Sequence, residues 1–203
     1  MFKTNMGGGW HSDINLHQHD HPALKQLFGH VLNTAEQVTR EIYPDVGEIR
    51  PEDWRMESWI NSNGRDAYNA WHDHSSYYQD HSNIWAGVYY VDNGAPDGDI
   101  PPEGEIVFRD DFLGPQKEVA TPVRPMRTVE FAAEAGKFFI FPAWLRHHVK
   151  PYKGVGERVS LAFNLAHPAI DVDINPRYRR LPLAWKMFPG LMKRLRRVSP
   201  VEL

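Results

Sequence analysis

The clearest helical pattern in the chain lies between residues 22 and 42. Apolar side chains recur there at steps of three and four residues, which places them in one stripe along a helix: Leu24, Leu27, Phe28, Val31, Leu32, Ala35, Val38 and Ile42. Asp20 and His21 are suited to cap its start, Pro22 suits its first turn, and Tyr43-Pro44-Asp45 ends the periodicity. The pattern predicts one amphipathic helix that packs on the outside of a sheet.

After residue 54 the pattern changes to short runs of aromatic and β-branched residues, separated by Gly, Pro and Asp. These runs predict at least six strands, at residues 56–60, 84–91, 105–108, 128–131, 137–141 and 158–165. The last run alternates, with Arg158, Ser160, Ala162 and Asn164 on one face and apolar residues on the other. A polar face within an aromatic-rich sheet indicates that the face lines a cavity. Many short strands with turns between them favour a mainly β jelly roll or sandwich.

The composition narrows the class of protein. The chain has 203 residues, enough for one ordinary domain, and it has no Cys, which excludes disulfide scaffolds, zinc fingers, iron–sulfur clusters and Cys nucleophiles. A net charge of −3 gives no general argument for a nucleic-acid partner. No apolar run approaches the roughly 18 residues of a membrane span, and the start lacks the apolar core of a signal peptide. We therefore expect a cytoplasmic protein with no integral membrane segment and no nucleic-acid partner.

Residues 171–203 differ from the rest of the chain. They carry basic side chains interleaved with apolar ones, while Pro182 and Pro189 break them into short pieces. We interpret them as a basic, helical, amphipathic C-terminal tail packed on the jelly roll; a role toward a membrane surface, a protein partner or an acidic substrate stays open, as does a homodimer contact. The expected organisation is one domain over residues 1–170, with an arm (1–21), a helix (22–42) and a jelly-roll core (about 54–166), followed by this tail.

The first candidate for chemistry is His72-Asp73-His74. On an extended strand the two imidazoles point the same way and could share one metal ion, although a chain with 11 His contains such a pair easily by chance. Far downstream come His147 and then Arg158. A jelly roll can bring the ends of such distant strands together at its mouth, and this combination is the layout needed to bind a metal and anchor an anion beside it.

Six ordered motifs strengthen this interpretation and cover roughly residues 54–166. They are Trp59-Ile60-Asn61; the segment 68–74 (YNAWHDH); 87–91 (GVYYV); 104–110 (GEIVFRD); 141–151 (FPAWLRHHVKP); and 158–164 (RVSLAFN). In this order they resemble the iron(II)/2-oxoglutarate-dependent oxygenases. The resemblance is closest to the prolyl-hydroxylase-like branch and to the bacterial and phage family called "putative 2-oxoglutarate–Fe(II) oxygenase".

The resemblance implies a double-stranded β-helix, the cupin-like jelly roll, and an enzyme that uses Fe(II) with 2-oxoglutarate and O2 as co-substrates. Such an enzyme hydroxylates or otherwise oxidises a C–H bond of an amino acid, a peptide or a natural product, and it releases succinate and CO2. The resemblance implies His72, His74 and His147 as metal ligands. It implies Arg158 as the partner of the distal carboxylate of 2-oxoglutarate, helped by Ser160 and Tyr90, with Asn61 and Tyr68 as further pocket residues.

The third metal ligand is the point where the sequence departs from most of the class, which uses His-x-Asp or His-x-Glu. His74 stands where the carboxylate is usual, and Asp73, His81, a halide or a water molecule are the alternatives. The missing carboxylate keeps a second function open, a three-His cupin-like dioxygenase that needs no 2-oxoglutarate. A third alternative is a non-catalytic jelly-roll module that binds a ligand.

Overall fold

The computed structural model describes residues 5–75, 77–78, 81–109 and 128–170. Its helices are the 3-10 turns η1 (Leu16–Gln18) and η2 (Pro51–Asp53) and the α-helix α1 (Pro22–Ile42). Its strands are β1 (Asn5–Met6), β2 (Trp10–His11), β3 (Arg55–Asn63), β4 (Tyr68–His72), β5 (Tyr77–Tyr78), β6 (His81–Ser82), β7 (Trp85–Asp92), β8 (Ile106–Arg109), β9 (Thr128–Phe131), β10 (Phe138–Pro142), β11 (His147–Val149) and β12 (Arg158–Ala166). All six predicted strands and the predicted helix are present, which confirms the mainly β class.

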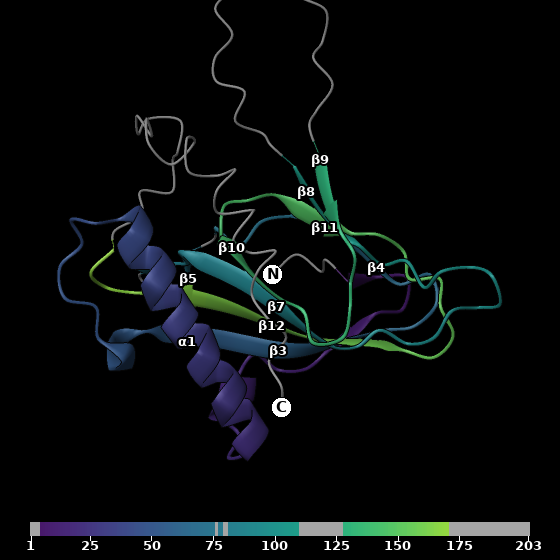
Figure 1. The fold of residues 1–203 in the computed structure, drawn as a ribbon, viewed down its shortest axis with the longest axis horizontal. Coiled ribbons are helices and arrows are strands. Elements are labelled where there is room, and N and C mark those ends of the chain that lie inside the picture. The colour runs from purple at the N-terminus through teal and green to yellow at the C-terminus, as the bar shows by residue number, and fades with distance from the viewer. Residues whose placement is uncertain (1–4, 76, 79–80, 110–127, 171–203) are drawn as a thin grey trace, which may run out of the picture.

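Two five-stranded antiparallel sheets form the core. The larger follows the order β10-β7-β12-β3-β2 and the smaller the order β1-β4-β11-β8-β9 (Figure 1). Apart from the consecutive pairs β2–β3 and β8–β9, strands that are neighbours within a sheet are distant in sequence. This is the arrangement of a jelly roll, and it brings residues from all parts of the chain to the space between the sheets.

Helix α1 covers the outer face of the larger sheet. Its apolar stripe, which includes Leu27, Phe28 and Val31, packs in one buried cluster with side chains from β7, β10 and β12. The Nε1–H of Trp85 on β7 also donates to Oγ1 of Thr39 on the helix at 2.8 Å. In Figure 1 the helix lies beside β7, β12 and β3, away from β8 and β9. The predicted position of the helix outside the sheet is therefore confirmed.

The two faces of β12 have the different roles that their alternation predicts. Leu161, Phe163 and Leu165 belong to the cluster beneath α1, whereas Arg158 and Ser160 face the space between the sheets and are buried there. A second apolar cluster lines the same inner space and includes Ala86, Val88 and Tyr90 from β7 with residues from β8 and β10. The cavity is therefore walled by apolar residues and carries polar side chains from β12.

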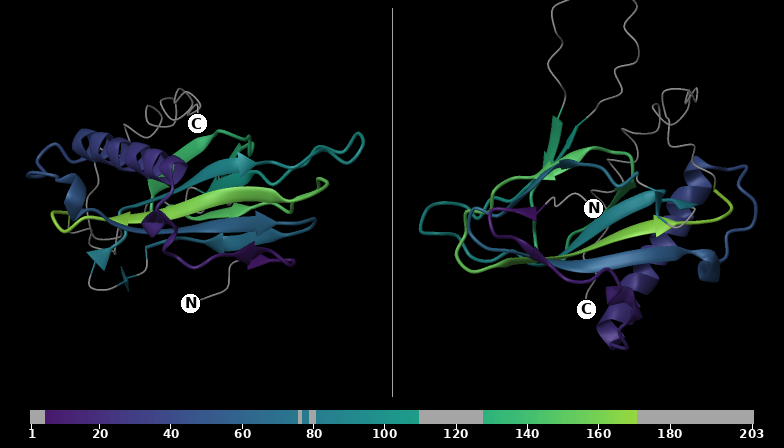
Figure 2. Two further views of the ribbon diagram at one scale, coloured as in Figure 1. Left: turned by 90° about the horizontal axis from the view of Figure 1, so that it is seen from below. Right: turned by 180° about the vertical axis from the view of Figure 1, so that it is seen from behind.

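The N-terminal arm connects the two sheets. β1 pairs with β4 in the smaller sheet and β2 pairs with β3 in the larger one. Figure 2 shows this arm, in purple, along the free side of β3. The predicted C-terminal tail, residues 171–203, lies outside the described residues. Within the described part of the chain, no helix has the length and apolarity needed to cross a membrane.

Candidate active site

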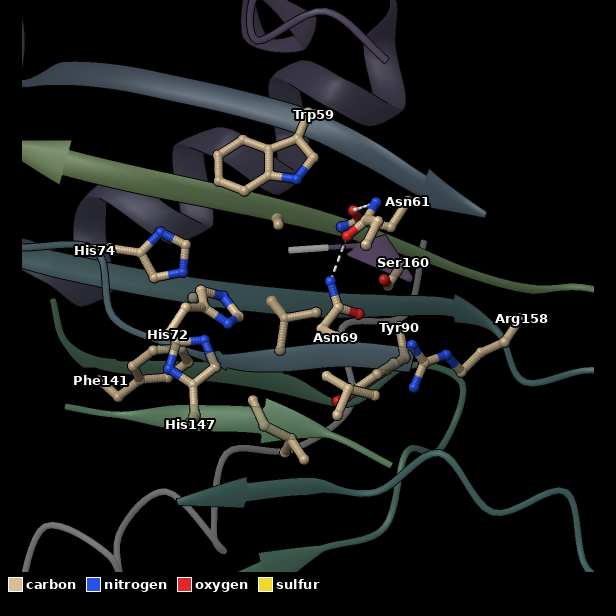
Figure 3. Close-up of a pocket in the computed structure, with 16 residues that line it drawn as sticks. Trp59, Asn61, Asn69, His72, His74, Tyr90, Phe141, His147, Arg158 and Ser160 are labelled. Carbon is tan, nitrogen blue, oxygen red and sulfur yellow. Dashed lines mark hydrogen bonds between the residues drawn. The ribbon is translucent and has the colours of Figure 1, made fainter. Parts of the chain in front are cut away.

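One pocket lies between the two sheets and gathers most of the residues singled out above. The larger sheet contributes residues of β3, β7, β10 and β12, and the smaller sheet contributes residues of β1, β4, β8 and β11. Figure 3 shows three imidazole rings at one end of it and the guanidinium of Arg158 at the other. The pocket therefore has two chemically distinct ends.

The three imidazoles belong to His72, His74 and His147. Each offers one ring nitrogen to a common point, and these three atoms lie within 4.8 Å of one another. The ring centroids are 4.3 Å apart for His72 and His147, and 5.0 Å apart for His72 and His74. A convergent group of imidazoles is a site that iron binds readily.

Strand pairing explains how residues so distant in sequence meet. His147 opens β11 directly opposite His72, the last residue of β4. The next pair is Val149 with Asn69, so that two steps on β11 oppose three on β4, and β4 carries a bulge. The bulge turns both His72 and Asn69 into the pocket. His74 follows the end of the strand, where its N–H donates to the carbonyl oxygen of Ala143 at 2.8 Å.

Hydrogen bonds and burial keep the imidazoles in the form that binds a metal. Nδ1 of His72 lies 2.7 Å from the Ala70 carbonyl oxygen, and Nδ1 of His147 lies 2.8 Å from that of Leu145. Because a carbonyl only accepts, each Nδ1 carries the proton, and each Nε2 keeps a free lone pair. Burial lowers the pKa of His74 to about 3 and holds the pKa of His147 well below its ordinary value. The residues present therefore fit a divalent metal ion.

The residues proposed as alternatives to His74 differ in position. Asp73 is exposed and turns away, because its Oδ1 accepts from the N–H and the hydroxyl of Ser75. His81 lies on β6, and its side chain is outside the part of the structure that is described. Among the described residues, the group of potential ligands at the pocket is His72, His74 and His147.

Arg158 at the other end is a buried cation that forms no ion pair with any residue in the described part of the chain. It is 2% exposed. Its Nη1 donates to the Gly104 carbonyl oxygen at 2.5 Å, and its Nη2 donates to Oδ1 of Asn63 at 3.2 Å. Its Nε and the Nδ2 of Asn63 are buried donors without a partner, and among the described residues no carboxylate lies within 4.0 Å. Burial lowers the pKa of Arg158 because the charged form is desolvated. This donor-rich end fits a carboxylate such as the distal one of 2-oxoglutarate.

The other residues expected to bind the co-substrate separate into two groups. Ser160, Tyr90 and Asn61 line the pocket, whereas Tyr68 does not; its neighbour Asn69 takes that place. Burial raises the pKa of Tyr90 to about 12, so its hydroxyl stays protonated.

Asn5 and Asn69 were not predicted as pocket residues, and they form a hydrogen-bonded chain with Asn61, which was. Nδ2 of Asn69 donates to Oδ1 of Asn5, and Nδ2 of Asn5 donates to Oδ1 of Asn61 at 3.3 Å. Asn5 comes from the N-terminal arm and carries no motif of its own. Only the pairing of β1 with β4 brings it to the pocket.

The family model described as "Putative 2OG-Fe(II) oxygenase" matches residues 57–164, more than half of the 203-residue chain. The chain belongs to this family. It is a 2-oxoglutarate-dependent oxygenase, an enzyme that uses Fe(II), with 2-oxoglutarate and O2 as co-substrates. The matched segment holds the three histidines and Arg158, which the motifs had indicated.

Solved structures support the fold. A prolyl-4-hydroxylase from Pseudomonas putida is 14% identical with a TM-score of 0.51, and the match covers 79% of this chain and 72% of that one. A prolyl 4-hydroxylase from Phytophthora capsici is 18% identical with a TM-score of 0.50, and the match covers 96% of this chain and 59% of that one. A search of curated proteins finds no match. At these identities the likeness shows the fold alone, and it confirms the double-stranded β-helix.

Proposed function

We propose that His72, His74 and His147 hold the iron(II) of this oxygenase and that Arg158 anchors 2-oxoglutarate. The observation that carries the proposal is the pocket itself, which has three convergent, neutral imidazoles at one end and a buried, unpaired guanidinium at the other. A keto acid with a carboxylate at each end matches this polarity, since one end binds the metal and the other binds the guanidinium.

The protein's own residues bind and orient the co-substrate. Arg158 holds the distal carboxylate in the fork of its guanidinium, and Ser160 and Tyr90, on the same side of the pocket, are positioned to donate further hydrogen bonds. Val88 and Phe141 form apolar walls that exclude water. When bound, iron(II) supplies the open coordination positions at which the keto acid and O2 react.

The substrate that we propose is an amino acid, a peptide side chain or a natural-product intermediate. Hydroxylation of one of its C–H bonds would accompany the conversion of 2-oxoglutarate to succinate and CO2. We also propose that residues 1–170 act as a single oxygenase domain, because the arm and the helix share a core with the jelly roll and the arm also reaches the pocket.

The test is an anaerobic titration. Purified protein is loaded with iron(II), 2-oxoglutarate is added, and the visible charge-transfer band of the iron–keto-acid chelate is recorded. His147→Ala should lose both the band and the retained iron. His148→Ala is the matched control, because His148 is the next residue but packs on Trp71, with ring centroids 4.2 Å apart, on the other side of the strand. We expect the control to keep the band.

Two outcomes would contradict the proposal, the first for the metal ligands and the second for the keto-acid anchor. A band of full intensity in His147→Ala would exclude His147 as a ligand. Iron retained by the wild type without any band on addition of 2-oxoglutarate would show that the three imidazoles bind the metal but that Arg158 does not bring the keto acid to it.

A further inference from the structure

The polar face of β12 continues beyond the pocket. Arg158, Ser160 and Ala162 line the pocket, and Asn164 is the next residue on the same face, about 7 Å further along the strand. Asn164 is only 7% exposed. The cavity face therefore presents one more buried polar side chain than the binding of iron and 2-oxoglutarate requires.

Strand register places Asn164 in one row with Phe141, whose ring lies beside that of His147. It stands opposite Glu57 on β3 and opposite Ala86 on β7, and Ala86 in turn stands opposite Phe141 on β10. The ring of Phe141 contacts that of His147, with centroids 4.9 Å apart. Glu57 and Asn164, called here the Glu57–Asn164 pair, therefore lie in the same row as a residue that touches the proposed metal centre.

Both members of the pair have a hydrogen-bond acceptor with nothing to accept. Nδ2 of Asn164 donates to Oε2 of Glu57 at 3.2 Å, and because a carboxylate only accepts, this bond fixes the orientation of the amide. Oδ1 of Asn164 and Oε1 of Glu57 are both buried without a partner. A pair that served only to tie β3 to β12 would not need two orphaned acceptors, each of which destabilises the protein.

The charge of the pair is also uncompensated. Among the described residues, no Lys or Arg nitrogen lies within 4.0 Å of Glu57. His17 is close enough for Glu57 to raise its pKa, but burial has the larger effect and lowers it. His17 is therefore mostly neutral at pH 7 and does not balance the carboxylate. Two free acceptors and one negative charge are complementary to a cationic nitrogen with several N–H bonds.

We propose that the Glu57–Asn164 pair binds a cationic nitrogen group of the substrate, an ammonium or a guanidinium, and so sets the specificity of the oxygenase. The proposal rests on the function proposed above, because it takes the three histidines as the place of reaction. It narrows the substrate class to amino acids, basic side chains or natural products that carry such a group near the oxidised carbon.

Matched probes test this proposal on the anaerobic complex of the protein with iron(II) and 2-oxoglutarate. Nα-acetyl-L-lysine and Nα-acetyl-L-arginine carry a cationic side chain, and Nα-acetyl-L-norleucine and Nα-acetyl-L-citrulline are their uncharged counterparts. Free L-norleucine differs from its acetylated form by an α-ammonium. Binding is measured by the change in the visible band and, independently, by calorimetry.

We expect at least one cationic probe to bind about tenfold or more tightly than its uncharged counterpart, as charged hydrogen bonds of this kind produce. Tighter binding of free norleucine than of its acetylated form would identify the cationic group as an α-ammonium. Tighter binding of acetyl-lysine or acetyl-arginine than of the uncharged counterpart would identify it as a side-chain group. Glu57→Gln, which keeps the shape and removes the charge, should abolish the preference. Asn164→Ser should weaken it by a smaller factor.

Glu48→Gln is the control for loss of a carboxylate, because Glu48 is exposed and pairs with Arg50 at 3.1 Å far from the pocket. Equal binding of every cationic probe and its counterpart in the wild type would overturn the proposal, as would a Glu57→Gln variant that keeps the preference. The visible band distinguishes a failure of the Glu57–Asn164 proposal from a failure of the proposed iron and keto-acid site. A band without preference refutes only the Glu57–Asn164 pair, whereas a missing band in the wild type refutes the proposed iron and keto-acid site.

Discussion

The two ends of the inner face of β12 and β3 have opposite polarity. At one end Arg158 and Asn63 present buried donors without partners, and at the other Asn164 and Glu57 present buried acceptors without partners. Arg158 and Asn164 are six residues apart, which is about 20 Å along a strand. His74 lies beside Trp59 of β3 in the interval between them, with ring centroids 6.1 Å apart. On the two proposals above, one pair of strands would provide an anion site at one end and a cation site at the other, and co-substrate and substrate would approach the metal from different ends.

The largest effect is expected when Arg158, which provides the buried donors at one end, is removed. Arg158→Ala should raise the concentration of 2-oxoglutarate needed for half-maximal formation of the visible band by about 100-fold or more, because two charge-assisted hydrogen bonds are lost. Arg158→Lys keeps the charge without the planar fork, so its half-maximal 2-oxoglutarate concentration should lie between those of Arg158→Ala and the wild type.

Circular dichroism and thermal melting of both variants establish that they fold. If folded Arg158→Ala bound the keto acid as tightly as the wild type, the donor end would not be the co-substrate anchor. The polarity of the two strands would then have no bearing on which ligand binds where.

A smaller effect is expected when Arg158 is moved rather than removed. Gly104 has φ +84°, and a Cβ built on it would lie 2.9 Å from Nη1 of Arg158. Gly104→Ala should destabilise the fold by about 1–3 kcal/mol through its backbone conformation and should raise the half-saturating 2-oxoglutarate concentration by about tenfold.

Gly98 provides the matched control. It has φ +60°, and a Cβ there meets nothing within 4 Å. Gly98→Ala should therefore show the backbone cost in a urea unfolding curve while its binding of 2-oxoglutarate stays unchanged. Equal effects of the two substitutions on binding would remove the argument that Gly104 positions the guanidinium.

The last prediction concerns stability rather than ligand binding, and it involves the three histidines. Burial lowers the pKa of His72, His74 and His147 in the folded protein, so the unfolded chain binds more protons below about pH 6.5. In metal-free protein, the free energy of unfolding should therefore fall as the pH is lowered from 7.5 to 5.0. Each histidine contributes at most about 1.4 kcal/mol per pH unit to this slope.

Urea unfolding of EDTA-treated protein at several pH values measures the slope. His74→Gln should make it shallower, whereas His19→Gln, at an exposed position outside the pocket, should not. A slope that is the same in His74→Gln and the wild type would mean that His74 does not enter the folded state in its neutral form.

The strands and the helix were predictable because each depends on neighbours in sequence. The 22–42 stripe matches α1 residue for residue, and the alternation from Arg158 onward matches the two faces of β12. The bulge in β4 was not predictable, since it arises from pairing with β11, and it is the reason that Asn69 rather than Tyr68 lines the pocket. The rings of His72 and His74 also come together without the continuous strand considered for them, because β4 ends at His72.

The sequence by itself determined the class of the fold, the family, and the residue types from which a metal and a carboxylate site could be built. The motifs also indicated three of the 11 histidines, His72, His74 and His147. Only the tertiary structure decided how close their ring nitrogens lie, that Asn5 of the arm reaches the pocket, and that Glu57 stands beside Asn164. The reason is physical. Periodicity and motifs record interactions over a few residues, whereas a jelly roll pairs strands about a hundred residues apart, and its cavity chemistry depends on the register of those pairs.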